Sequence, residues 1–160
     1  MLSKASITLL RYPGGKSKAV KLILPFFSNN LKELVSPFLG GGAIELALAS
    51  KGTIIHGYDA YSNLINFWNW VKYFPNVLAD ETDEILKNDF DQNKFKNLQW
   101  FLRSGEVRRD NLLATAAAFF AVNRASFSGS TLSGGYSPNH PRFNQRSIDK
   151  IRTFGMENFH

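Results

Sequence analysis

The sequence predicts an α/β fold that becomes helical in its second half. Residues 33–59 have the pattern of a strand, a glycine turn, a helix and a second strand, the unit from which parallel sheets are built. Residues 62–123 instead carry the apolar periodicity of successive helices. The change falls near 60–75, so we expect an α/β portion over 1–65 and a helical portion over 66–160.

The α/β portion is expected to contain two helices and two strands. In chain order, its elements are predicted at 16–29 (helix), 33–38 (strand), 43–51 (helix) and 53–58 (strand). Pro25 bends or ends the first helix, because a proline ring clashes with the preceding turn. Gly52 ends the second helix, since glycine accepts the left-handed backbone of a helix end.

The helical portion is expected to contain five helices and one long loop. The helices are predicted at 62–74, 77–88, 91–104, 110–123 and 144–153. Asp110 is a suitable N-cap for the fourth, whose small and aromatic residues are typical of a buried helix. The loop over 124–141 is rich in Ser, Gly and Pro.

Composition restricts the class of protein. The apolar fraction is 44% and the aromatic fraction 14%, enough for a packed core and against disorder. The absence of cysteine excludes disulfides and thiolate sites. No apolar run approaches the roughly 20 residues of a membrane span, so we expect a cytoplasmic protein without membrane contact. The net charge of +6 suits a polyanionic partner, but a generic basic protein has the same charge.

A glycine turn followed by an acid predicts a nucleoside pocket. Gly40, Gly41 and Gly42 lie between a predicted strand and helix, where the missing side chains let a ligand approach the backbone. Asp59 ends the next strand, where a carboxylate can accept hydrogen bonds from both ribose hydroxyls. Three glycines alone also fit a simple tight turn; the acid favours the pocket.

Two other glycine motifs fail on spacing. The dinucleotide fingerprint needs a glycine at position 45, where Glu45 stands and would repel a pyrophosphate. The phosphate loop of nucleotide triphosphatases needs a glycine at position 10, which is Leu10. The sequence therefore argues against both nucleotide-phosphate sites.

Four segments resemble the motifs of the Dam-type (D12 class) adenine-N6 DNA methyltransferases, in the order of that family. They are residues 11–16 (RYPGGK), 36–42 (SPFLGGG), 57–64 (GYDAYSNL) and 123–129 (NRASFSG). The resemblance implies a doubly wound, Rossmann-like methyltransferase fold, incomplete here, with an inserted helical target-recognition region. It also implies S-adenosyl-L-methionine as cofactor, double-stranded DNA as partner and a role in bacterial or phage restriction-modification.

The resemblance also assigns cofactor-binding residues. Lys16 would pair with the carboxylate of the methionine moiety, and Asp59 would hold the ribose hydroxyls. Tyr58 would touch the adenine edge. The full set implied is Tyr12, Pro13, Gly14, Lys16, Phe38, Gly40, Gly42, Tyr58 and Asp59.

The sequence departs from the family pattern at two places. Ser36 stands where the family usually has an acid; its loss weakens the pocket, or Glu45 compensates from the helix. The catalytic tetrapeptide, Asp-Pro-Pro-Tyr or a close variant, is absent, because no two prolines are adjacent. An enzyme that methylates adenine must hold the N6 atom in line with the methyl donor. In the family, the catalytic tetrapeptide supplies the atoms that hold it there.

The missing motif leaves two interpretations open, and no catalytic residue is predicted. The chain is a truncated or split methyltransferase, inactive alone, whose catalytic motif comes from a C-terminal segment or a second chain. Alternatively, it is a non-catalytic DNA-binding or regulatory module derived from that fold.

Basic and aromatic residues of the helical portion are candidates for DNA contact. The predicted set is Asn123, Arg124, Phe127, Tyr136, Arg142 and Arg146. Arg142, Arg146 and Lys150 recur every four residues on one expected helical face with Arg152; Arg103, Arg108 and Arg109 form a second group. Asn139 and His140 lie in the same loop as the aromatics. A solvated helix face and simple loop packing are the alternatives.

No metal site is predicted, since the histidines are scattered. The acidic run at Asp80, Glu81, Asp83 and Glu84 is expected to be a solvated helix face.

Overall fold

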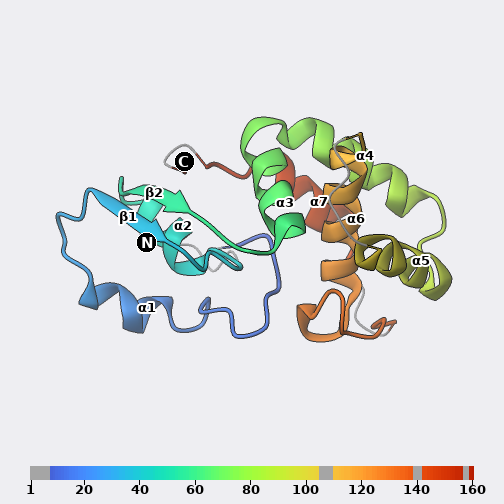
Figure 1. Cartoon of the computed structure of the whole chain (residues 1–160), viewed down its shortest axis with the longest axis horizontal. Helices are drawn as coiled ribbons and strands as arrows, with labels where there is room; N and C mark the ends of the chain where they lie inside the picture. Colours follow the sequence, from blue (N-terminus) through green and yellow to red (C-terminus); the bar gives the residue numbers. More distant parts are fainter. Residues whose placement is uncertain (1–7, 105–109, 139–141, 157–158) are drawn as a thin grey trace.

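The computed structural model describes residues 8–104, 110–138, 142–156 and 159–160. Two parts lie side by side (Figure 1): a small α/β part with the strands, and a part made of helices. The mixed α/β class expected from the sequence is confirmed. The division into functional portions at residues 65 and 66 stays a prediction.

The α/β part contains a parallel pair of strands. Its elements are α1 (Val20–Ile23), the 3₁₀ helix η1 (Leu24–Phe26), β1 (Glu33–Ser36), α2 (Ala43–Ala49) and β2 (Ile54–Gly57). Strand β1 pairs with β2 from Glu33 opposite Ile54 to Ser36 opposite Gly57. Helix α2 connects them, so the predicted strand–helix–strand unit is confirmed.

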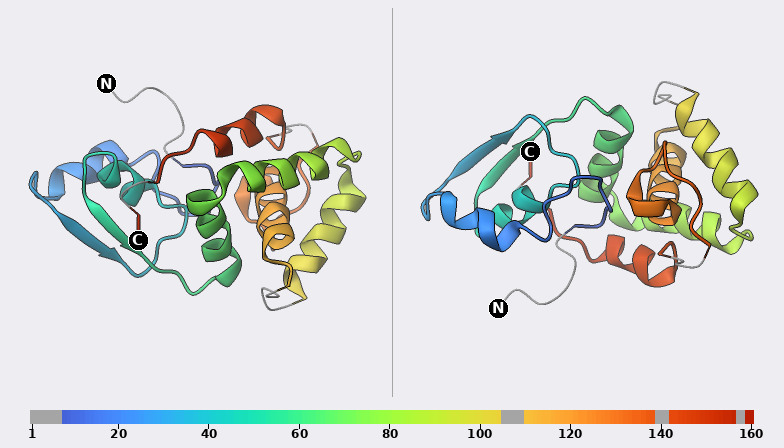
Figure 2. Two further views of the ribbon diagram at one scale, coloured as in Figure 1. Left: turned by 90° about the horizontal axis from the view of Figure 1, so that it is seen from above. Right: turned by 90° about the horizontal axis from the view of Figure 1, so that it is seen from below.

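The end of the chain returns to this sheet. After α7 the backbone runs back to the strands, as both views of Figure 2 show. Phe159 bridges Ile55 in parallel, and the His160 amide donates to the Ile55 carbonyl at 2.7 Å. Strand β2 thus lies between β1 and the C-terminal residues. The sequence analysis did not predict this pairing, because two residues are too few for a strand pattern.

The helical part is built around one buried helix. Its elements are α3 (Ser62–Tyr73), α4 (Pro75–Lys87), α5 (Gln92–Arg103), α6 (Leu112–Ala125), the 3₁₀ helix η2 (Phe127–Gly129) and α7 (Gln145–Arg152). Helices α3, α4 and α5 all pack against α6. The alanines of α6 favour a helix and let its neighbours approach closely. Phe120 of α6 stacks on Phe67 of α3, with ring centroids 5.6 Å apart.

Helix α7 is fastened to α4 by two ion pairs. Arg152 contacts Asp80 at 2.8 Å and Asp83 at 2.7 Å. The prediction that the acidic run is simply solvated was therefore wrong for Asp83, which is buried, whereas Asp80 is exposed as expected and also pairs with Arg152. Arg152 is likewise engaged within the protein and does not belong to a free basic stripe.

Some predicted element bounds were wrong. The helix expected over 16–29 is reduced to α1 and η1, with Pro25 inside η1. Helix α6 begins at Leu112 after Asn111, whose side chain makes no cap bond, so Asp110 is not its N-cap. Arg142 precedes α7 and cannot share a face of that helix with Arg146.

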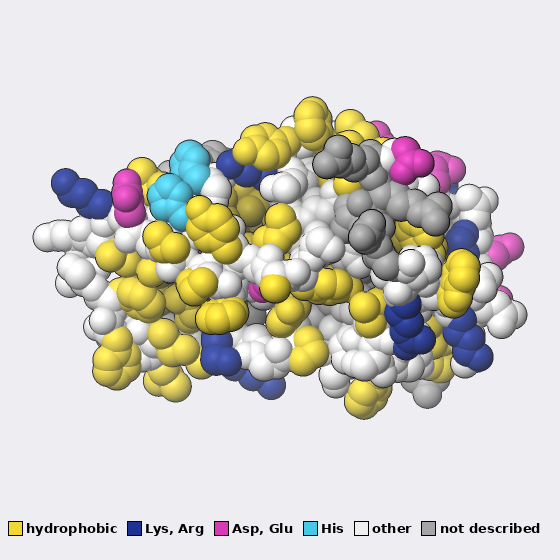
Figure 3. Space-filling model, in the orientation of Figure 1, with side chains coloured by type: hydrophobic (Ala, Val, Ile, Leu, Met, Phe, Trp, Pro, Cys, Tyr) yellow, Lys and Arg dark blue, Asp and Glu magenta, His cyan; other side chains and the backbone are white. Residues whose placement is uncertain are grey.

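One face of the sheet carries exposed apolar side chains. Ser36 points toward α2, where it bonds Glu45, so the neighbouring Val35 lies on the opposite face. Val35 is 63% exposed, and Phe38 just beyond the strand is 87% exposed. Figure 3 shows hydrophobic side chains gathered over the α/β part. Among the described residues, no helix has the length and hydrophobicity to span a membrane.

Candidate functional site

A tight turn lines a large cavity in the α/β part of the molecule. The Gly15 amide donates to the Tyr12 carbonyl at 2.9 Å, which closes a four-residue turn with Pro13 second. Gly14, the third residue, has φ of +72°. Proline second and a positive φ third define a type II turn, which the RYPGGK sequence dictates locally.

The glycine turn after β1 lines the same cavity, and several parts of the chain hold it. Gly40 donates its amide to the Asp59 carboxylate at 2.9 Å. The Trp68 indole of α3 donates to the Gly40 carbonyl at 3.2 Å, and the Thr8 hydroxyl donates to the Gly41 carbonyl. Gly40 has φ of +51°, a conformation that favours glycine.

The ring of Tyr12 lies against this glycine turn. A Cβ atom on Gly40 would stand 3.2 Å from Cε1 of Tyr12, and one on Gly41 would stand 3.0 Å from its Cβ. The two glycines therefore make room for a side chain of the protein itself. Burial and the nearby Asp59 carboxylate raise the pKa of Tyr12.

The cavity between the two turns measures about 970 Å³. This volume lies within the roughly 300–1,000 Å³ of small-molecule sites. Seven predicted cofactor-binding residues line it: Tyr12, Pro13, Gly14, Lys16, Phe38, Gly40 and Gly42. Sequence reasoning missed Thr8, Arg11, Ser17, Lys18 and Ser128, and Arg142 lines this cavity as well.

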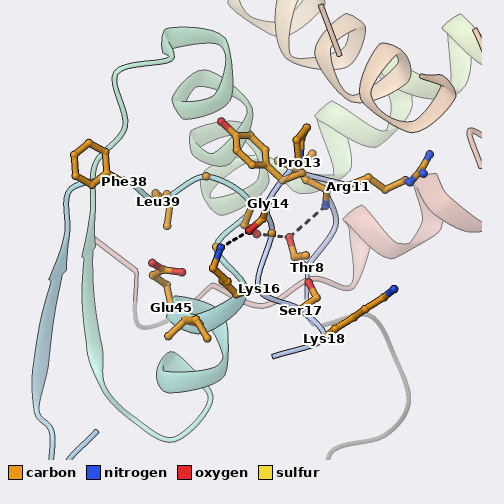
Figure 4. Close-up of a pocket in the computed structure, with 18 of the residues that line it drawn as sticks. Thr8, Arg11, Pro13, Gly14, Lys16, Ser17, Lys18, Phe38, Leu39 and Glu45 are labelled. Atoms are coloured by element: carbon orange, nitrogen blue, oxygen red, sulfur yellow. Dashed lines mark hydrogen bonds between the residues drawn. The ribbon is translucent and has the colours of Figure 1, made fainter. Parts of the chain in front are cut away.

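Opposite charges stand in the same cavity. Lys16 and Glu45 extend from different walls into the space (Figure 4). The Lys16 ammonium donates to the Gly14 carbonyl at 2.5 Å, and the Glu45 carboxylate accepts from the Ser36 hydroxyl at 2.7 Å. Glu45 of α2 is thus hydrogen-bonded to Ser36, the serine at the position where the resemblance leads us to expect an acid.

Two predicted cofactor-binding residues do not line the cavity. Tyr58 is exposed outside it. Asp59 lies behind the glycine turn, where its carboxylate accepts from the amides of Gly40 and Tyr61, at 2.9 and 3.0 Å. In this arrangement the acid braces the turn, and its expected contact with a ribose stays a prediction.

Asn123 is completely buried and bonded within the protein. Its carbonyl oxygen accepts from the Arg11 amide at 3.0 Å, and its amide donates to the Arg11 carbonyl at 2.7 Å. The same amide group also contacts Gly129 and Thr131. No polar atom of Asn123 faces a surface, so its position contradicts a direct contact with DNA. The residue ties α6 to the segment before the type II turn.

The two loop aromatics have different surroundings. Tyr136 packs near Phe95 of α5, with ring centroids 5.5 Å apart, in agreement with the loop-packing alternative. Phe127 is 67% exposed. Arg103 donates to the Leu132 carbonyl, and so holds the same loop. The predicted contributions of Arg108, Arg109, Asn139 and His140 lie outside the described residues.

The remaining basic candidates separate into two groups. Arg124 and Arg142 lie together, because the Arg124 Nε donates to the Arg142 carbonyl at 3.2 Å. Burial, followed by the charges of Arg11 and Arg142, lowers the pKa of Arg124 to about 10. Arg146 is exposed on α7 and lines neither cavity.

The sequence of this chain matches a defined protein family. The family described as D12 class N6 adenine-specific DNA methyltransferase matches residues 12–152. The chain therefore belongs to that family, as the four motifs indicate.

The chain is also similar to curated proteins that are named as methyltransferases or methylases. The chain is 27% identical over 135 residues to a type II methyltransferase, M1.LlaDCHI of Lactococcus lactis subsp. cremoris; the match covers 81% of this chain and 45% of that protein. It is also 27% identical over 126 residues to the DNA adenine methylase of Vibrio cholerae serotype O1, covering 79% of this chain and 43% of that protein. The chain spans less than half the length of these relatives.

Proposed function

We propose that this chain binds S-adenosyl-L-methionine and DNA as part of an adenine-N6 DNA methyltransferase. The observation that carries the proposal is the cavity between the Tyr12–Gly15 turn and the glycine turn, lined by seven residues that the family motifs predict. Its volume is suitable for a nucleoside with an amino-acid tail. When bound, the cofactor supplies an electrophilic methyl group on its sulfonium.

Lys16 and Glu45 together suit the zwitterionic end of this cofactor. An ammonium attracts the α-carboxylate of the methionine moiety, and a carboxylate attracts its α-amino group. Glu45 is steadied by Ser36, so the serine that replaces the family's acid retains an indirect role. The exposed ring of Phe38 at the edge of the cavity provides an apolar surface for the remaining part.

The DNA side of the proposal involves Arg124, Arg142, Arg146 and Phe127. Cationic side chains neutralise phosphates and position a duplex without reading its sequence. An exposed aromatic such as Phe127 can insert between bases or stack on one. Tyr136, which packs against α5, serves here to support the loop that carries Phe127.

In this proposal the catalytic motif is supplied by residues outside this sequence, in the same polypeptide or in a second one. Those residues would also cover the exposed face of the sheet around Val35, because apolar side chains on a strand face are normally buried. The Rossmann-like completion of the fold belongs to this proposal.

Isothermal titration with S-adenosylhomocysteine tests the pocket. The wild-type chain should bind, and Lys16→Met and Glu45→Gln should each weaken binding about tenfold or more, the equivalent of roughly one charge-assisted hydrogen bond. Lys51→Met, a matched change of an exposed lysine outside the cavity, should leave affinity unchanged. A folded wild-type chain that does not bind would refute the proposal.

Asp59 needs a variant that separates its two roles. Asp59→Asn removes the charge and keeps the shape. A loss of affinity with unchanged thermal stability would support the ribose contact. An equal loss of both would instead assign Asp59 to bracing the glycine turn alone.

One alternative function is a DNA-binding module without catalysis. It is favoured because the sequence has no two adjacent prolines and therefore no Asp-Pro-Pro-Tyr motif. Such a module would bind DNA in a salt-dependent way that ignores the cofactor. Methylation assays after addition of the C-terminal half of a relative discriminate between the two. Restored activity supports the split enzyme, and its absence with intact DNA binding supports the module.

A further inference from the structure

A second, smaller cavity lies beside the first and is lined by positive charge. Its volume is about 220 Å³, below the roughly 300–1,000 Å³ of cofactor-sized sites. The lining residues are Thr8, Leu9, Leu10, Arg11, Arg124, Arg142, Ser147 and Lys150. Four of these carry a positive charge and none is acidic, so the cavity suits a small anion.

Three separate parts of the chain bring the arginines together. Asn123 holds the backbone of Arg11 from α6, and the Arg11 guanidinium donates to the Ser126 carbonyl at 3.0 Å. The backbone of Arg11 also lies directly against Gly129, where a Cβ atom would collide with its carbonyl. The SFSG segment is therefore shaped around Arg11.

Arg124 is held in the same way by backbone oxygens. Its guanidinium donates to the carbonyls of Arg142 and Leu9, at 3.2 and 3.4 Å. These neutral partners orient the side chain but do not cancel its charge. The geometry is that of a preorganised cationic group.

Within the described part of the chain, no carboxylate pairs with these arginines. The ion pairs there join Lys87 to Glu84, and Arg152 to Asp80 and Asp83. Burial, followed by the charge of Arg142, lowers the pKa of Arg11, and burial, followed by the charges of Arg11 and Arg142, lowers that of Arg124. The positive side chains that line this cavity repel one another, and a bound anion would relieve that repulsion.

We propose that Arg11, Arg124, Arg142 and Lys150 form a site for one phosphate oxyanion, filled in the DNA complex by a single backbone phosphodiester. Guanidinium groups match the geometry of phosphate oxygens through paired hydrogen bonds. The inference rests on the proposed function, since it names the part of DNA that this surface holds. Arg11 and Arg142 line both cavities, so the phosphate lies next to the pocket proposed for the methyl donor.

Thermal unfolding in inorganic phosphate, with sodium chloride at equal ionic strength as reference, tests the site itself. The Tm of the wild type should rise with phosphate, because a ligand that binds the folded state stabilises it. Arg142→Gln should raise the Tm in chloride by removing repulsion, and should abolish the rise with phosphate. Lys96→Gln, an exposed lysine of α5 outside both cavities, should keep the wild-type response.

A higher Tm in chloride together with a lost response to phosphate distinguishes a binding role of Arg142 from a structural one. A variant of a merely structural arginine would lower the Tm and still respond to phosphate, and this result would overturn the proposal. Lys150→Gln, on the exposed side of α7, provides a second variant with the same expected loss of response.

Duplex binding identifies the source of the phosphate. The slope of log Kd against log salt concentration should flatten by about 0.9 in Arg142→Gln, the contribution of one phosphate contact. A phosphate response without any change of slope would overturn the DNA assignment. Titration with S-adenosylhomocysteine in the same preparation distinguishes the failures: a bound cofactor product with no phosphate response refutes this site and leaves the proposed function standing.

Discussion

The centre of the helical part and the α/β part of the molecule differ in the burial of their phenylalanine side chains. In the helical part, Phe67, Phe119 and Phe120 are completely buried around α6. In the α/β part, Phe26 is 90% exposed and Phe38 is almost as exposed. Both parts contribute to one apolar core, but the fully buried phenylalanines of the described residues all lie in the helical part.

The difference teaches which contacts stabilise this chain. Burial of apolar area is the main favourable contribution to folding, so most of the stability comes from the helices around α6. The sheet face around Val35 is exposed and therefore contributes little. Substitutions in the two parts should therefore have unequal effects.

The largest expected effect is the loss of the stacked phenylalanine. Phe120→Ala removes a buried ring that contacts Phe67, and should lower the free energy of unfolding by about 3–5 kcal/mol. Phe26→Ala removes the same group from an exposed site and should change it by less than about 0.5 kcal/mol. Urea denaturation measures both, and equal losses would refute the comparison.

The next effect concerns the connection between the two parts. Asn123→Ala leaves the Arg11 amide without its partner in a buried place, which should cost about 1–3 kcal/mol. Asn111→Ala is the control, because the exposed side chain of Asn111 makes no cap bond. If both variants unfold at the same urea concentration as the wild type, the hydrogen bonds between Asn123 and the Arg11 backbone contribute nothing to stability.

A smaller effect is expected from the ion pairs between α4 and α7. Arg152→Gln breaks the contacts with Asp80 and Asp83, and should lower the free energy of unfolding by about 1 kcal/mol in low salt and less in high salt. The exposed pair in α4 provides the comparison, since Lys87→Gln should have almost no effect. A loss in Arg152→Gln that is independent of salt would contradict an electrostatic origin.

The smallest effect on stability should come from a substitution on the exposed sheet face. There we expect a change in the self-association of the chain instead. Val35→Thr keeps the branched shape preferred in strands and replaces a methyl group by a hydroxyl. The free energy of unfolding should move by less than about 0.5 kcal/mol, while the sedimentation coefficient at high concentration should shift toward that of a monomer. An unchanged distribution would show that this face does not mediate self-association.

Local patterns explain most of what could be predicted. The RYPGGK segment forms a type II turn, which proline second and a glycine with positive φ third favour locally. The strand–helix–strand unit follows from an apolar pattern that reports burial directly. The positions of Asn123 and Arg152 could not be predicted in this way, because their partners lie more than sixty residues away in sequence.

The sequence by itself determined the family, the order of the elements and the glycine turn after the first strand, since each depends on neighbouring residues. Only the tertiary structure decided that Asp59 braces the glycine turn, that Asn123 is buried and that Arg152 is paired. It also decided that Arg11, Arg124 and Arg142 share one cavity. Electrostatic and hydrogen-bonding roles depend on distances across the fold, and a linear pattern of charges contains no such distances.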